Sequence, residues 1–178
     1  MRVSVIQMNQ GSEKQANLDQ ARRLIEAAVA ADRPGMVCLP ETWTNLGGGR
    51  ESRQVAAEVL PVGGGEGGPA YELLRGLARA HGIHVHGGSM IEAPGAGDDP
   101  TKLYNTTVVF DPDGAEIARY RKIHMFDIVA PDGTGYRESA LYGAGDRLVT
   151  FEAGGITFGC TICYDMRFAE HYVALRRL

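Results

Sequence analysis

The sequence predicts an α/β fold whose sheet is at least partly parallel and covered by helices. Near the N-terminus, residues 3–7 have the pattern of a short buried strand, residues 13–31 that of a helix, and residues 36–39 that of a continuously apolar strand. A strand, a helix and a strand in this order indicate a βαβ unit, whose two strands run parallel. Near the C-terminus, the β-forming run 156–162 stops at a cysteine, and a polar, helix-starting segment follows. That strand–turn–helix pattern indicates the same class.

The first helix is predicted by its periodicity. Four apolar residues fall on one face at helical spacing, namely Leu18, Ala21, Ile25 and Ala28. Ser12 is the expected N-cap, because its hydroxyl can accept a hydrogen bond from a free amide of the first turn. The Asp-Arg-Pro-Gly sequence of residues 32–35 ends the helix.

The remaining elements follow from turn signals and apolar runs. We expect helical segments over residues 51–60, 69–81 and 168–178. Residues 84–90, which include Gly87 and Gly88, are expected to form a strand that ends in a close approach of the backbone. Two hairpins are predicted, one pairing residues 103–110 with 115–121 and one pairing 148–151 with 156–162. Residues 123–146 are expected to form a long irregular loop, and such a loop in a compact domain is more often functional than idle.

Composition limits the classes of function. A chain of 178 residues can form one domain, which we expect to span residues 1–178. The formal charge of −4 and the scattered basic residues argue against nucleic acid as a partner. No apolar run approaches the length of a membrane span, and the N-terminus lacks the apolar core of a signal peptide. We therefore expect no membrane partner and a cytoplasmic location.

The cysteines do not predict a disulfide framework or a metal site. Cys160 and Cys163 form a CxxC pair, but strand alternation places them on opposite faces, and the only other cysteine, Cys38, lies on a separate strand. A second conceivable metal site consists of the histidines His81, His84 and His86. A structural role for those histidines is the better interpretation, so we expect neither a metal nor another cofactor.

Three residues suited to catalysis stand directly after predicted strands: Glu41, Lys122 and Cys163. A thiol can act as nucleophile, a carboxylate can take and return a proton, and an ammonium can stabilise an oxyanion. The alternatives are that Cys163 is a small buried hydrophobic residue and that Glu41 is an exposed loop carboxylate. A histidine base is not required, although His124 and His171 are available. We expect Lys122 to favour the thiolate form of Cys163.

Three segments of the chain resemble the signature segments of the nitrilase, or carbon–nitrogen hydrolase, superfamily. They are Leu39-Pro40-Glu41, Arg119-Tyr120-Arg121-Lys122-Ile123-His124 and Cys163-Tyr164-Asp165-Met166-Arg167-Phe168, in the family's order. Their amino-acid sequences are most similar to those of the branch that contains omega-amidase and the amidase for deaminated glutathione. The resemblance implies a four-layer α-β-β-α sandwich that assembles into homodimers or larger homo-oligomers.

The resemblance also implies a role for each matching residue. Cys163 would attack the carbon of a small amide to form a thioester, with Glu41 as general base and acid. Lys122 and the backbone N–H of Tyr164 would hold the oxyanion, and Glu138 would position the substrate. An omega-amide of a dicarboxylate, deaminated glutathione, a carbamoyl amino acid and a simple aliphatic amide all stay open as substrates. Tyr136 and Arg137 are candidates to contact a substrate carboxylate.

The chain departs from the family in its length. Members continue well beyond the cysteine segment, whereas this sequence stops at Leu178, inside a predicted helix without a stop signal. The resemblance therefore covers the N-terminal portion of the fold, and we expect these 178 residues to have little or no activity by themselves. The alternative is a truncated, non-catalytic member that acts as a binding or oligomerisation module.

Overall fold

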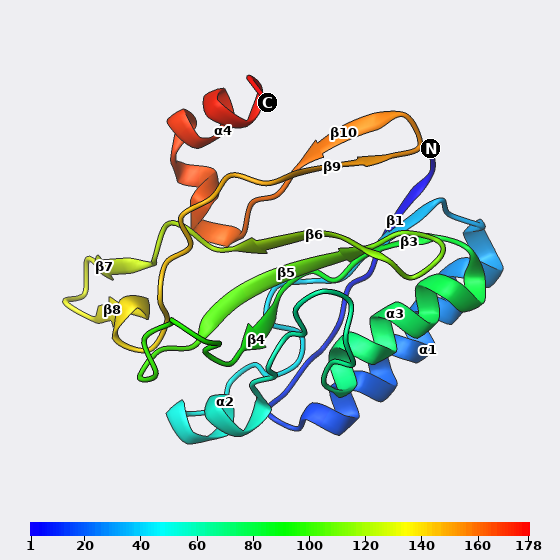
Figure 1. Ribbon diagram of the computed structural model, residues 1–178. Helices are drawn as coiled ribbons and strands as arrows, with labels where there is room; N and C mark the ends of the chain where they lie inside the picture. The colour runs from blue at the N-terminus through cyan, green and yellow to red at the C-terminus, as the bar shows by residue number, and fades with distance from the viewer.

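A six-stranded sheet forms the centre of the protein in a computed structural model that describes residues 1–178 (Figure 1). Its strands are β1 (Val3–Val5), β2 (Met36–Cys38), β3 (His84–His86), β4 (Met90–Glu92), β5 (Tyr104–Phe110) and β6 (Glu116–Arg121). Strands β1, β2 and β3 pair in parallel, as the predicted βαβ unit requires. Strand β5 is antiparallel to its neighbours: β3 and β4 lie along one of its edges and β6 along the other.

Further layers cover both faces of this sheet (Figure 1). Helices α1 (Lys14–Asp32) and α3 (Pro69–His81) pack on one face, and their apolar sides join the larger core. The hairpin of β9 (Thr150–Ala153) and β10 (Ile156–Gly159) covers the other face, where Phe151 packs with Tyr120 in a second core. Helix α4 (Ala169–Leu175) lies beyond that hairpin, with Leu175 against Gly159. The order of layers is the α-β-β-α order that the resemblance implied.

Strand β1 is the expected strand at residues 3–7, but it is shorter and is not buried. It forms the edge of the sheet, and Val5 is 81% exposed. Val3 and Val5 point to the same side as Met36 and Cys38 of β2, because parallel partners share a face. The β9–β10 hairpin covers that side over β2 and β6 but does not extend over β1.

Two predictions about helix ends had different outcomes. Helix α3 has the predicted bounds, with Pro69 in its first turn and Gly82 in the left-handed conformation just after its end. Ser12 is not an N-cap, because α1 starts at Lys14 and its N-cap residue is Glu13. The backbone carbonyl of Ser12 instead accepts a hydrogen bond from Asn45 Nδ2 at 2.8 Å.

Other element boundaries also differ from the expected ones. Helix α2 (Arg50–Ala56) is shorter than the predicted segment 51–60, and β10 ends at Gly159 rather than at residue 162. The residues from Cys163 to Arg167 form a 3₁₀ helix, so that α4 starts only at Ala169. The expected irregular loop 123–146 holds a third, small hairpin, β7 (Asp127–Val129) with β8 (Gly135–Arg137), followed by a 3₁₀ turn at Glu138–Ala140.

The close approach expected at Gly87 and Gly88 fixes the end of β2. Gly88 has a φ of +57°, and a Cβ on it would lie 2.0 Å from the carbonyl oxygen of Pro40. Only glycine fits there, because both the conformation and the space exclude a side chain. Ser89 then accepts a hydrogen bond on Oγ from the backbone N–H of Thr42, the residue after Glu41. No helix of the protein has the length and apolar character needed to cross a membrane.

Candidate active site

Glu41, Lys122 and Cys163 line one cavity of about 440 Å³. Glu41 follows β2, Lys122 is the first residue after β6, and Cys163 comes four residues after β10. The structure thus brings together three side chains that are far apart in the sequence. The central sheet supplies two of them and the hairpin that packs on it supplies the third.

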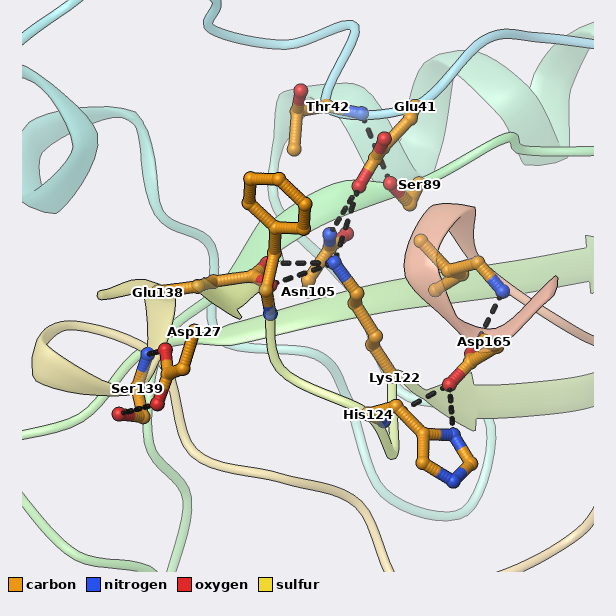
Figure 2. A network of polar contacts seen from close by, with 12 residues as sticks. Glu41, Thr42, Ser89, Asn105, Lys122, His124, Asp127, Glu138, Ser139 and Asp165 are labelled. Carbon is orange, nitrogen blue, oxygen red and sulfur yellow. Dashed lines mark hydrogen bonds and ion pairs between the residues drawn. The ribbon is translucent and has the colours of Figure 1, made fainter. Parts of the chain in front are cut away.

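Lys122 lies at the centre of the polar contacts (Figure 2). Its side chain is only 2% exposed, and its Nζ lies 2.9 Å and 2.7 Å from the two carboxylate oxygens of Glu138. The same Nζ is 3.8 Å from Glu41 Oε1. A buried ammonium is costly unless opposite charges lie close, and these two carboxylates provide that compensation.

Glu41 is held by the strand beside it. Asn105, in β5, donates a hydrogen bond from Nδ2 to Glu41 Oε1 at 2.9 Å. The next residue, Thr42, has a φ of +45°, which is uncommon for a residue with a side chain, and its amide is bound by Ser89. Both contacts fix the direction in which the carboxylate points into the cavity.

Cys163 occupies a sharp turn with an unusual backbone conformation. Its φ is +47°, and the residue as a whole is exposed although its thiol is partly buried, whereas Cys160 and Ile162 just before it are buried. This confirms the predicted alternation that separates Cys160 from Cys163. A left-handed backbone conformation at a residue other than glycine costs free energy and is typical of active sites, where the surrounding structure fixes the direction of a side chain.

Lys122 acts to lower the pKa of Cys163 and so favours its thiolate, as expected, but other groups outweigh it. Partial burial, followed by the negative charge and hydrogen bond of Glu41, raises the pKa of Cys163 above its ordinary value. Lys122 acts in the opposite direction but is outweighed, because Glu138 and Glu41 lie beside it. The thiol is therefore protonated at neutral pH and needs a base when it reacts.

Glu138 and Tyr164 also lie at the cavity or next to it. Glu138 begins the 3₁₀ turn after β8, and its Oε2 accepts a second hydrogen bond from the backbone N–H of Phe126 at 2.6 Å. Tyr164 follows the cysteine, and its ring packs edge-on against Phe126 with the ring centroids 5.0 Å apart. Phe126 thereby connects the segment that carries Glu138 with the cysteine turn.

Comparison with protein families gives one match, described as Carbon-nitrogen hydrolase, which covers residues 2–178. The chain belongs to this family. Among curated relatives, this carbon-nitrogen hydrolase is 37% identical over 169 residues to "Omega-amidase NIT2" of Homo sapiens, which covers 95% of the chain and 56% of the relative. It is 35% identical over 170 residues to "Hydrolase C26A3.11" of Schizosaccharomyces pombe, with 95% of the chain and 49% of the relative covered.

Solved structures of the superfamily have the same fold. The Saccharomyces cerevisiae Nit3 structure, described as a member of branch 10 of the nitrilase superfamily, aligns with a TM-score of 0.84 at 29% identity, covering 99% of this chain and 60% of Nit3. The C. elegans NitFhit protein aligns with a TM-score of 0.78 at 27% identity, covering 98% of this chain and 40% of NitFhit. The chain thus spans about half the length of the curated relatives it matches, and it corresponds to the N-terminal portion of the nitrilase fold.

Two polar residues of this carbon-nitrogen hydrolase contact the site or its surroundings, but the sequence assigned no role to either of them. Asn105, the second residue of β5, is buried and contacts Glu41, and Asp165, two residues after Cys163, is fully buried. A signal existed for Asn105, because asparagine is depleted in strands and its presence in a β-forming run calls for a reason. Asp165 stands in the third signature segment, but its role could not be read there, since Tyr120 and His124 lie more than 40 residues away in the sequence.

One group of side chains in this carbon-nitrogen hydrolase has metal-ligand chemistry. His124, Asp165 and His171 each offer one ligand atom, and these atoms lie within 4.8 Å of one another. The Asp165 carboxylate already accepts four hydrogen bonds, one of them from His124 Nδ1 at 2.7 Å. A metal ion would have to displace at least one of these donors, so the cluster is better described as a hydrogen-bonded junction.

Two arginines give the cavity of this carbon-nitrogen hydrolase a positive wall. Arg53 from α2 and Arg137 from β8 both line the cavity, and neither makes an ion pair with a carboxylate of the protein. Lys122, by contrast, is neutralised by Glu138 and Glu41. Neither guanidinium is neutralised by an ion pair, so both can bind an anionic group of a ligand.

Proposed function

We propose that the protein is the catalytic portion of an amidase that hydrolyses a small amide to an acid and ammonia through a thioester on Cys163. The observation that carries this proposal is the meeting of a thiol, a carboxylate and an ammonium in one cavity. Membership of the carbon-nitrogen hydrolase family and similarity to omega-amidases support it.

The arrangement supports a two-stage reaction. Glu41 accepts the thiol proton as Cys163 Sγ attacks the amide carbon, and Lys122, with the backbone N–H of Tyr164, stabilises the oxyanion. The C–N bond then breaks, and the leaving nitrogen takes the proton from Glu41 and departs as ammonia. Water attacks the thioester and gives a proton to Glu41, the C–S bond breaks, and the proton returns to the sulfur.

The raised pKa of Cys163 fits this assignment of roles. A thiol that is protonated at rest cannot attack without a base, and Glu41 is the carboxylate whose charge and hydrogen bond act on it. Glu138 keeps the Lys122 ammonium pointed into the cavity by accepting from it with both oxygens, and from this position it would help to orient the substrate.

The proposed substrate is the omega-amide of a dicarboxylate, because the cavity offers unpaired cations for its free carboxylate. Arg53 and Arg137 line the same cavity as Cys163, so a ligand held there has both the thiol and the guanidinium groups around it. Assembly into homo-oligomers and a cytoplasmic location stay predictions made from the family resemblance and the sequence.

Substrate choice can be tested by ammonia release from glutaramic acid and from its neutral counterpart butyramide. The assay uses the 178-residue chain, from which we expect little turnover, and a chimera extended with the C-terminal portion of an omega-amidase relative. In the chimera we expect a preference for glutaramic acid of about tenfold or more in kcat/KM, the value of one good charged contact. Arg137→Gln should reduce that preference through KM. Equal use of both amides would contradict the proposed substrate class.

A non-catalytic binding or oligomerisation module is the competing function. Acylation of Cys163 by p-nitrophenyl acetate separates the two, because it needs only the first half of the reaction. Cys38 and Cys160 are internal references: burial raises the pKa of Cys38 to about 11 and that of Cys160 to about 12. We expect mass spectrometry to find the acyl group on Cys163, formed faster than on glutathione at the same thiolate concentration. A rate no higher than that of glutathione would favour the binding module.

A further inference from the structure

Asp165 is a fully buried carboxylate two residues after the cysteine, and it does not line the cavity. Each of its oxygens accepts two hydrogen bonds. Oδ2 accepts from Tyr120 Oη at 2.6 Å and from the backbone N–H of Ile162 at 2.9 Å. Oδ1 accepts from the backbone N–H of His124 at 2.9 Å and lies 2.7 Å from His124 Nδ1 (Figure 2). Its acceptor capacity is fully used.

The donors come from the two segments that carry the reacting groups. Tyr120 and His124 stand two residues before and two residues after Lys122, and Ile162 directly precedes Cys163. One carboxylate therefore bridges the end of β6 to the cysteine turn.

The cysteine turn needs such support because of its backbone. The left-handed conformation of Cys163 is unfavourable by itself and persists only where neighbouring groups fix it. Asp165 closes the turn from both sides: its backbone N–H donates to the carbonyl of Ile162 at 3.1 Å, and its side chain accepts from the N–H of the same residue.

We propose that Asp165 is a positioning residue that holds the Cys163 turn in its left-handed conformation and keeps this turn next to Lys122. The roles of Cys163 and Lys122 rest on the proposed function, but the placement of the thiol does not depend on turnover. Asp165 touches no substrate and acts through the residues it binds. If its bonds are weakened, the turn relaxes and the thiol moves away from Glu41 and out of its partly buried place.

The carboxylate is well suited to this task because it stays ionised. Burial would raise the pKa of Asp165, but the hydrogen bonds from Tyr120, Ile162 and His124 outweigh it and hold the pKa below its ordinary value. An asparagine of the same shape cannot replace it. Whichever way the amide is turned, its NH₂ group meets a backbone N–H, of His124 or of Ile162, which can only donate.

The test measures the pH dependence of iodoacetamide alkylation at Cys163 in the 178-residue chain, by peptide mass spectrometry. Asp165→Asn should move the apparent pKa of this thiol down, toward the ordinary value of about 8.5. Tyr120→Phe removes one of the four bonds and should move it in the same direction by less. The matched control is Asp111→Asn, because Asp111 also holds a turn by accepting backbone N–H groups, at the far end of β6. Its profile should equal that of the parent.

Cys38 and Cys160 report on global unfolding in the same samples, since both must stay slow to react if the fold is intact. An unchanged profile in a folded Asp165→Asn chain overturns the proposal. If that variant does not fold, Tyr120→Phe decides: a downward shift supports the positioning role, and an unchanged profile overturns it. Because no turnover is involved, an inactive chain with a shifted profile would refute the amidase and leave this inference standing.

Discussion

Replacing Glu41 with glutamine should lower amide turnover by the extended chimera about 10²–10⁴-fold, the range expected when a general base is lost. The same change should speed alkylation of Cys163 at pH 7.5. Burial, and then the charge and hydrogen bond of Glu41, raise the pKa of Cys163, so removing the charge lowers that pKa and increases the thiolate fraction. Ammonia release and iodoacetamide labelling, measured on one protein preparation, should therefore change in opposite directions.

This divergence distinguishes a base from a structural carboxylate. A residue that only supports the fold would reduce turnover and also expose Cys38 and Cys160 to labelling. The control is Glu66→Gln, an exposed carboxylate in a glycine-rich loop outside the cavity, which should change neither rate. If Glu41→Gln slowed both reactions at Cys163 while the other cysteines stayed protected, Glu41 would not be the base.

Replacing Lys122 with methionine should affect both stability and turnover. The Lys122 side chain is almost completely buried, and its loss leaves Glu138 without its counterion. Breaking a buried ion pair from one side costs about 3–5 kcal/mol of unfolding free energy. We expect urea unfolding of the 178-residue chain to show a loss of this size in the free energy of unfolding. We also expect no detectable turnover in the chimera, because the oxyanion loses its cation.

A second substitution separates the two effects. Glu138→Gln in the Lys122→Met background removes the uncompensated charge, so most of the stability should return while turnover stays absent. Lys102→Met is the matched control, since the Lys102 ammonium donates to the carbonyl of Ser139 and makes no ion pair with a carboxylate. Recovery of turnover in the double variant would show that Lys122 serves only to neutralise Glu138.

The parts of the fold predicted from the sequence are those with local signals. Helix α3 has the bounds predicted from Pro69 and from its spacing of leucines, with Gly82 following its end. The β5–β6 hairpin surrounds the turn that begins at Asp111, as its composition indicated. Glu41 and Cys163 were found because polar residues that follow apolar strands lie at the ends of a sheet, and this needs no knowledge of tertiary contacts.

The missed features depend on contacts between distant segments. The β7–β8 hairpin is mostly exposed, so its residues show no alternation of apolar and polar side chains. The protonated state of Cys163 follows from burial and from two carboxylates contributed by other segments. The role of Asp165 depends on Tyr120 and His124, which the chain brings near only after folding.

Strand register links the β5–β6 turn to chemistry at the other end of β6. Tyr120 and Lys122 alternate with Arg121, whose guanidinium instead pairs with Glu92 and Asp98 away from the cysteine. A slip of one residue would exchange the two sides of the strand, so that a guanidinium replaced the ammonium. The short loop that begins at Asp111 therefore determines which cation faces the thiol, although it lies far from any bond that is made or broken.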